Sequence, residues 1–218
     1  MAGIADNLQA IRGRLAGSPG VNLLAVSKGH GAEAIKQAAA AGQKAFGENY
    51  VQEAVEKMKV LPPLEWHLIG PLQSNKTRAA AEHFDWVQTI ASEKIARRLS
   101  EQRPAHLPPL NVLIQVNVSG EATKSGVRPQ DVPALARAVA ALPRLKLRGL
   151  MVIPEPGAPR ARYQEAKRLF DAIKSEFGVD TLSMGMTDDL EVAIDEGATM
   201  VRIGTAIFGQ RKKVKAAA

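Results

Sequence analysis

Residues 22–49 read NLLAVSKGHGAEAIKQAAAAGQKAFGEN. A short run of apolar residues, Asn22–Lys28, precedes an alanine-rich segment with helical periodicity, Ala32–Ala41. A second apolar run, Lys44–Asn49, follows after a glycine that signals a turn. Short apolar runs predict buried strands, and the segment between them is long enough for a helix. We therefore predict two parallel strands connected by a helix.

The same alternation continues along the rest of the chain. The runs that we predict as strands are Asn22–Lys28, Lys44–Asn49, Glu65–Pro71, Trp86–Ile90, Asn111–Asn117, Lys146–Ile153, Thr181–Gly185 and Met200–Thr205. The helices predicted between them are Ala32–Ala41, Val51–Val60, Asn75–Glu82, Ser92–Gln102, Pro129–Leu142, Ala161–Phe177 and Asp188–Glu196, and an extra helix, Ile4–Leu15, precedes the first strand. Strict alternation favours a parallel sheet, and this number of units in about 200 residues fits a closed (β/α)8 barrel of the TIM type.

An open, doubly wound sheet is the alternative architecture. It is less favoured because no G-x-G-x-x-G motif follows any predicted strand and because polar strand ends occur in all the units. The chain has 218 residues, of which 45% are apolar, and this is enough for one sizeable core. We predict a single α/β domain over residues 1–218, with a core from about residue 4 to residue 209 and a short basic C-terminal tail.

Composition excludes several classes of function. The chain contains no cysteine, which rules out disulfides, thiolate catalysis and cysteine-ligated metals and is typical of a cytoplasmic protein. Its four histidines are scattered, so we expect no metal site. The net charge is +7, but aromatic residues make up only 4% of the chain, so we expect no nucleic-acid binding. No signal peptide is evident and no apolar run approaches the roughly 20 residues of a membrane span, so we expect no membrane association.

Lys28 is the first candidate for chemistry. It ends a buried apolar run, where partial loss of water favours the neutral and nucleophilic amine over the ammonium form. Ser27 precedes it, and the flexible sequence Gly29-His30-Gly31 follows and leaves room for a ligand. Such an amine can condense with an aldehyde. The alternative is a lysine at a strand end that simply reaches solvent.

Two later segments are candidates for binding a phosphate. In Arg202-Ile203-Gly204-Thr205, the glycine permits close approach of the backbone, the threonine adds a hydroxyl, and Arg202 can face a ring nitrogen or an acidic group. Ser183 and Thr187, in the segment before an acidic helix start, offer further hydroxyl groups. The alternatives are a structural salt bridge at Arg202 and a helix N-cap at Thr187 or Asp188. Together with Lys28, these segments indicate an aldehyde that carries a phosphate.

Two other strand ends carry polar residues. Asn49 offers a hydrogen-bonding group near the predicted mouth of the barrel. His67 could carry a proton, but a single histidine within a strand is more often a hydrogen-bonded core residue, and we favour that interpretation. No nucleophile elbow is found.

Several stretches of the chain resemble the pyridoxal phosphate homeostasis protein family. They are LLAVSK, FGENYVQEA, WHLIGPLQSNK, VNVSGEATKSGV, RGLMVIP, LSMGMTDDLEVAI and GATMVRIGTAIFG, and they extend from residue 23 to residue 209. The resemblance implies a barrel related to the N-terminal domain of bacterial alanine racemase, with pyridoxal 5′-phosphate (PLP) held as a lysine aldimine. It implies that the protein buffers or delivers PLP without an evident catalytic turnover.

The resemblance also assigns roles to individual residues. Lys28 would be the Schiff-base lysine, and Arg202 would face the pyridine nitrogen. Gly204 and Thr205, together with Ser183 or Thr187, would hold the phosphate. Asn49 lies in a segment that lines the cofactor, and Lys124 would lie on a loop near the site.

One departure from the family pattern lies next to Lys28. The family usually continues the first strand as SKTKP, whereas this chain has Ser27-Lys28-Gly29-His30-Gly31. A second lysine is therefore missing, and any part that it takes in passing on the cofactor is open for this chain.

Three functions are compatible with these residues. The favoured one is a monomeric PLP carrier, with apo forms of PLP-dependent enzymes as the candidate recipients. The second is a small PLP-dependent amino-acid racemase. Racemisation needs a base on each face of the ligand, and only Lys28 is obvious, so we expect at most a weak side activity. The third is an aldolase that forms a Schiff base with a sugar phosphate, and the family resemblance argues against it.

Overall fold

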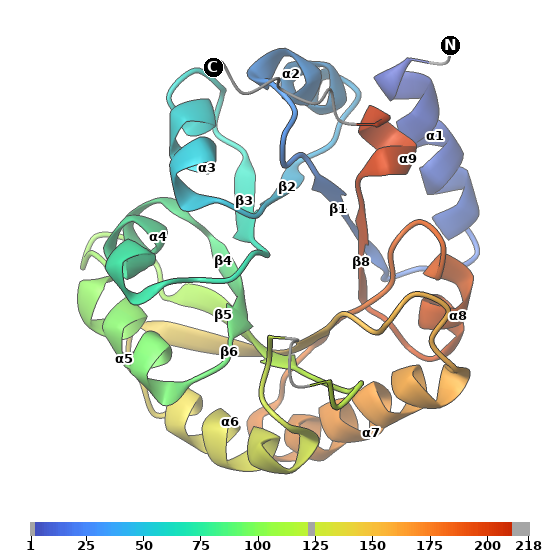
Figure 1. Cartoon of the computed structure of the whole chain (residues 1–218). Coiled ribbons are helices and arrows are strands. Elements are labelled where there is room, and N and C mark those ends of the chain that lie inside the picture. Colours follow the sequence, from blue (N-terminus) through green and yellow to red (C-terminus); the bar gives the residue numbers. More distant parts are fainter. Residues whose placement is uncertain (1–2, 122–124, 211–218) are drawn as a thin grey trace, which may run out of the picture.

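The computed structural model describes residues 3–121 and 125–210, and its eight strands form a closed parallel barrel (Figure 1). The strands are β1 (Asn22–Val26), β2 (Ala45–Glu48), β3 (Glu65–Leu68), β4 (Trp86–Ile90), β5 (Leu110–Val116), β6 (Leu145–Val152), β7 (Thr181–Ser183) and β8 (Met200–Ile203). Strands follow each other around the barrel in sequence order, and β8 pairs with β1 to close it. The closing register places Leu24 opposite Arg202. The open sheet is therefore excluded and the predicted TIM-type barrel is confirmed.

Helices surround the barrel (Figure 1). They are α1 (Ile4–Leu15), α2 (Ala32–Ala40), α3 (Val51–Met58), α4 (Thr77–His83), α5 (Glu93–Gln102), α6 (Val132–Ala140), α7 (Arg160–Phe177), α8 (Leu190–Asp195) and α9 (Thr205–Phe208), with short 3-10 turns at Ser74–Lys76 and Pro129–Asp131. The predicted N-terminal helix is α1, and it lies beside α9, where the side-chain amide of Asn7 donates to the Ile207 carbonyl at 2.9 Å. No described helix has the length and the apolar character that a membrane crossing requires.

Except for β4, which ends at Ile90 as predicted, the strands end one to three residues earlier than the sequence predicts. Lys28 and Asn49 lie just beyond the ends of β1 and β2, and Thr205 begins α9, a helix that we did not predict. The physical reason is that the polar residues after an apolar run can either continue the strand or begin the loop, so the sequence pattern alone does not mark where pairing stops. As a result, these three side chains sit in loops or at a helix start at the mouth of the barrel.

The core lies mainly between the barrel and the helices that cover it. Strand β5 and the second half of β6, Gly149–Val152, are almost entirely buried because parallel strands of a barrel are covered on both faces. Inside the barrel several polar side chains are also buried, among them His67, Gln88, Ser183 and Arg202. Buried polar groups need hydrogen-bond partners, and these residues supply them to each other. This polar interior lies below the candidate site and supports it.

Candidate functional site

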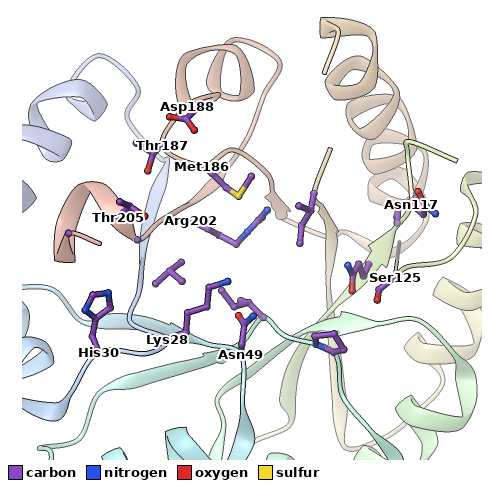
Figure 2. A pocket seen from close by; sticks show the side chains of 18 residues that line it. Lys28, His30, Asn49, Asn117, Ser125, Met186, Thr187, Asp188, Arg202 and Thr205 are labelled. Atoms are coloured by element: carbon purple, nitrogen blue, oxygen red, sulfur yellow. The ribbon is translucent and has the colours of Figure 1, made fainter. Parts of the chain in front are cut away.

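A cavity of about 580 Å³ opens at the C-terminal ends of the strands (Figure 2). The residues that line it come from loops after several different strands and are Val26, Lys28, His30, Asn49, Ile69, Pro71, Gln115, Val116, Asn117, Ser125, Ile153, Met186, Thr187, Asp188, Arg202, Gly204, Thr205 and Gly209. This is the face on which (β/α)8 barrels place their ligands. Figure 2 shows Lys28 and Arg202 extending into the cavity from different sides.

Six of the seven predicted site residues line this single cavity. They are Lys28, Asn49, Thr187, Arg202, Gly204 and Thr205. Ser183 is the exception, because it is fully buried below the cavity and is absent from the described lining. Lys124 and the basic tail from residue 211 lie outside the described residues.

Arg202 is held in place by two neutral partners. Its guanidinium donates to the Ser183 hydroxyl at 2.7 Å and to the Val152 carbonyl at 2.8 Å. Among the described residues we find no carboxylate paired with it, so the alternative of a structural salt bridge is not supported. Burial lowers the pKa of Arg202 to about 10, and the side chain therefore remains charged at neutral pH. A buried positive charge with a fixed direction thus faces the cavity.

A chain of hydrogen bonds extends from Arg202 through the barrel interior. The Ser183 hydroxyl, which accepts from Arg202, donates to the side-chain carbonyl of Gln88 at 2.7 Å. The Gln88 amide lies 2.8 Å from His67 Nδ1, and His67 Nε2 lies 2.7 Å from Glu65. These partners assign the histidine proton to Nε2, since Gln88 donates and the carboxylate accepts. Ser183 therefore orients Arg202 from below.

His67 is the buried core residue that we favoured from the sequence. It is fully buried and stacks on Trp86 with ring centroids 5.0 Å apart. Burial lowers the pKa of His67, although Glu65 opposes that shift. The histidine is therefore neutral in the folded protein, and it does not line the cavity in the described part of the chain.

The lowered pKa of His67 predicts a loss of stability in mild acid. Below about pH 6.5 the unfolded chain binds a proton at this histidine that the folded chain does not bind. The free energy of unfolding then decreases with falling pH, by at most about 1.4 kcal/mol per pH unit from this group. Urea unfolding at pH 7.5 and pH 5.5 should show a smaller acid loss in His67→Gln than in the wild type. An unchanged acid loss would contradict a neutral His67, and His106→Gln, at an exposed position, is the matched control.

The segment between β7 and α8 differs from the prediction in its helix cap. Thr187 and Asp188 do not cap α8, since Asp189 occupies the N-cap position. The Asp189 carboxylate accepts from the Met186 backbone N–H at 2.5 Å and from the Tyr163 hydroxyl at 2.7 Å. The capping prediction was therefore displaced by one residue. Thr187 and Asp188 instead contribute to the lining of the cavity.

Asn49 presents an acceptor that the described residues leave unused. Its Oδ1 atom is buried and has no hydrogen-bond partner in the described part of the chain. The Asn49 backbone is fixed by Gly70, because a Cβ at Gly70 would lie only 2.2 Å from the Asn49 carbonyl oxygen. A buried acceptor without a partner is costly, so a ligand that donates a hydrogen bond here would relieve that cost.

Sequence reasoning missed several residues that shape the site. Gln115, Asn117 and Ile153 line the cavity; Asn117 and Ile153 are the last residues of predicted strands, which is the signal that could have found them, whereas Gln115 lies two residues before the end of its predicted strand. Gln88 and Lys57 act from outside the lining. The partners of Gln88 are distant in sequence, and Lys57 bonds to Ser27 and Glu48 on other elements as well as to Glu53 on its own helix, so no local pattern identifies these roles.

These features together define a class of protein. It is a closed (β/α)8 barrel with a cavity at the C-terminal ends of its strands, a lysine two residues after the first strand and, at the last strand, a buried arginine followed by a glycine–threonine turn. The family described as alanine racemase, N-terminal domain, matches residues 1–212. Pyridoxal phosphate homeostasis proteins of Pseudomonas aeruginosa and Escherichia coli K12 are 58% and 54% identical to the chain. Those alignments cover 97% of this chain in both cases and 97% and 95% of the relatives.

The chain belongs to the pyridoxal phosphate homeostasis protein family, as these identities show. Among solved structures, PipY of Synechococcus elongatus with PLP bound is 39% identical, with a TM-score of 0.85 over 94% of this chain and 100% of PipY. Alanine racemase from Corynebacterium glutamicum is 20% identical, with a TM-score of 0.71 over 99% of this chain and 62% of the racemase. That lower likeness shows a shared barrel fold.

Proposed function

We propose that this chain binds PLP through Lys28 and serves the PLP supply of the cell as a carrier, without a catalytic turnover of its own. The observation that carries the proposal is the convergence of Lys28, Arg202 and the Gly204–Thr205 turn on one cavity. The PLP homeostasis proteins among its relatives and the PLP-bound PipY support the choice of ligand. When bound, PLP supplies an aldehyde that condenses with an amine and a ring that absorbs visible light.

The residues of the cavity fit such a ligand. Lys28 would offer the amine, and Arg202, which lines the cavity, would face the ring nitrogen. Asn49 Oδ1 can accept from a ring hydroxyl, which would satisfy an acceptor that is otherwise buried without a partner in the described structure. Gly204, Thr205 and Thr187 can hold a phosphate through backbone N–H and hydroxyl groups.

The second candidate function, amino-acid racemisation, requires a base opposite Lys28. Neither tyrosine supplies it within the described cavity lining. Tyr50 is 64% exposed at the start of α3, and Tyr163 is buried with its hydroxyl bonded to Asp189. Burial and this carboxylate raise the pKa of Tyr163, so it is a poor proton carrier. A charged Arg202 at the ring nitrogen would also keep that nitrogen unprotonated and weaken the ring as an electron sink.

One experiment separates the carrier from the two enzymes. The purified protein is incubated with PLP and freed of excess ligand, and its visible absorbance is recorded before and after borohydride. The loaded protein is then mixed with L-alanine in D2O, and separately with an apo PLP-dependent enzyme. We expect a visible band that borohydride removes, recovery of the apo-enzyme, and negligible deuterium at the alanine α-carbon.

Rapid deuterium incorporation would favour the racemase over the carrier. If no visible band forms at any PLP concentration, the proposal that the protein binds PLP is rejected. The aldolase then remains as the candidate function, because its sugar-phosphate substrate is colourless. His30 lines the cavity two residues after Lys28, where the family pattern has its second lysine. His30→Lys restores that second lysine. Comparing its recovery of the apo-enzyme with that of the wild type therefore tests whether the second lysine takes part in passing on the cofactor.

A further inference from the structure

Charged side chains outside the cavity hold both peptide groups that flank Lys28. On one side, the Ser27 carbonyl accepts a hydrogen bond from Lys57 Nζ at 3.1 Å. On the other side, the Gly29 N–H donates to the Glu53 carboxylate at 2.7 Å. The Lys28 backbone is thus fixed before and after its Cα atom, while its side chain extends into the cavity (Figure 2).

Lys57 links these two contacts into one network. Its ammonium group also donates to Glu48 and to Glu53, each at 2.7 Å. Glu48 in turn accepts from the Ser27 hydroxyl at 2.6 Å. Ser27 is therefore held through its side chain as well as its carbonyl, and both flanks of Lys28 depend on one buried ammonium group.

The burial of this network makes it rigid. The Lys57 side chain is 9% exposed and the Glu48 side chain is fully buried. Burial raises the pKa of Glu48, although the ammonium group of Lys57 opposes that shift. Opening a buried ion pair leaves an uncompensated charge in a low-dielectric interior, so the paired geometry is strongly favoured.

The network acts on Lys28 from outside the site. Glu53 and Lys57 are four residues apart on α3 and therefore lie on the same helix face. Neither they nor Glu48 belongs to the cavity lining in the described structure. Their hydrogen bonds to the backbone on both sides of Lys28 give them a direct route by which they can affect a ligand.

We propose that Lys57, with Glu48 and Glu53, is a positioning device that directs the Lys28 amine at the aldehyde of the ligand. This inference rests on the proposed function. In the step concerned, the lone pair of the neutral amine attacks the aldehyde carbon. The nitrogen and carbon become doubly bonded as the aldehyde oxygen leaves as water, which takes up the two hydrogens of the amine. Misplacing a reacting group by about 1 Å can cost up to roughly a hundredfold in rate.

The test compares PLP with pyridoxine 5′-phosphate, which has the same ring and phosphate but an alcohol in place of the aldehyde. Lys57→Met should slow formation of the visible band by roughly tenfold or more. Its affinity for pyridoxine 5′-phosphate, measured by calorimetry, should stay within about twofold, because the rest of the site is unchanged. Lys59→Met is the matched control, since Lys59 is an exposed lysine on the neighbouring turn that pairs only with Glu56 in the described structure.

A second pair of variants keeps the test decisive if Lys57→Met folds poorly. Glu53→Leu removes the acceptor of the Gly29 N–H, whereas Glu53→Gln retains an acceptor oxygen. We expect slow band formation in Glu53→Leu and a rate closer to wild type in Glu53→Gln.

Three results would overturn the proposal. Wild-type rates in both Lys57→Met and Glu53→Leu would show that Lys28 needs no such support. An equal loss of affinity for PLP and pyridoxine 5′-phosphate would indicate a merely structural role. If the wild-type protein binds pyridoxine 5′-phosphate but forms no band with PLP, the result contradicts the proposed function itself. The present inference, which rests on that function, is then contradicted as well.

Discussion

Lys28→Ala is expected to abolish the visible band that forms with PLP and to leave no borohydride-stable adduct. The amine is the nucleophile, and an alanine offers no replacement at this position of the cavity. The free energy of unfolding should change by less than about 1 kcal/mol, because Lys28 lies after the end of β1 and is only partly buried. The measurement is an absorbance titration with PLP, accompanied by urea unfolding.

The control is Lys36→Ala, which removes an exposed lysine from α2 and should leave the titration unchanged. A Lys28→Ala protein that still forms the full band would show that another amine reacts. Affinity for pyridoxine 5′-phosphate should persist in Lys28→Ala, since the residues that we assign to the ring and phosphate remain in place.

Gly70→Ala is expected to cause the largest loss of stability among simple substitutions at the site. A Cβ at Gly70 would lie 2.2 Å from the carbonyl oxygen of Asn49 and 2.7 Å from its Cα. Backbone atoms cannot tolerate such contacts, so the ends of β2 and β3 must separate. We expect a loss of about 3 kcal/mol in the free energy of unfolding, at the upper end of the usual cost of overpacking, because the atoms in contact belong to the backbone. Urea unfolding monitored by circular dichroism measures it.

The same substitution should also weaken PLP binding, because Asn49 lines the cavity and would be displaced. Gly17→Ala is the control, since a Cβ there meets nothing within 4 Å. A loss below about 1 kcal/mol in Gly70→Ala would contradict the close approach of the two strand ends.

Most of the fold could be predicted from the sequence because the apolar runs and helical segments alternate without interruption. Helix α9 was missed since Ile203-Gly204-Thr205-Ala206 continues the apolar character of β8, and a single helical turn leaves no periodicity to detect. Closure of the sheet was predicted from the number of strand–helix units in about 200 residues, and no local pattern indicates it. Closure depends on the pairing of β1 with β8, which are far apart in sequence.

Site residues could be predicted from the sequence where they follow the end of a strand. The direction in which a side chain points could not be predicted in the same way. Ser183 occupies the last position of β7, and the sequence does not tell whether its hydroxyl points up toward the cavity or into the barrel. In the structure it points toward Arg202 and Gln88. Lys57 has the helical spacing of an ordinary surface lysine, and its burial depends on Glu48, which a different element contributes.

The most direct test of the central claim is to map the reacting lysine in the wild-type protein. The protein is incubated with PLP, reduced with borohydride, digested and analysed by tandem mass spectrometry. We predict one pyridoxyl group, located on Lys28, at near-full occupancy. A label distributed over the exposed lysines, or concentrated on a lysine other than Lys28, would contradict the account.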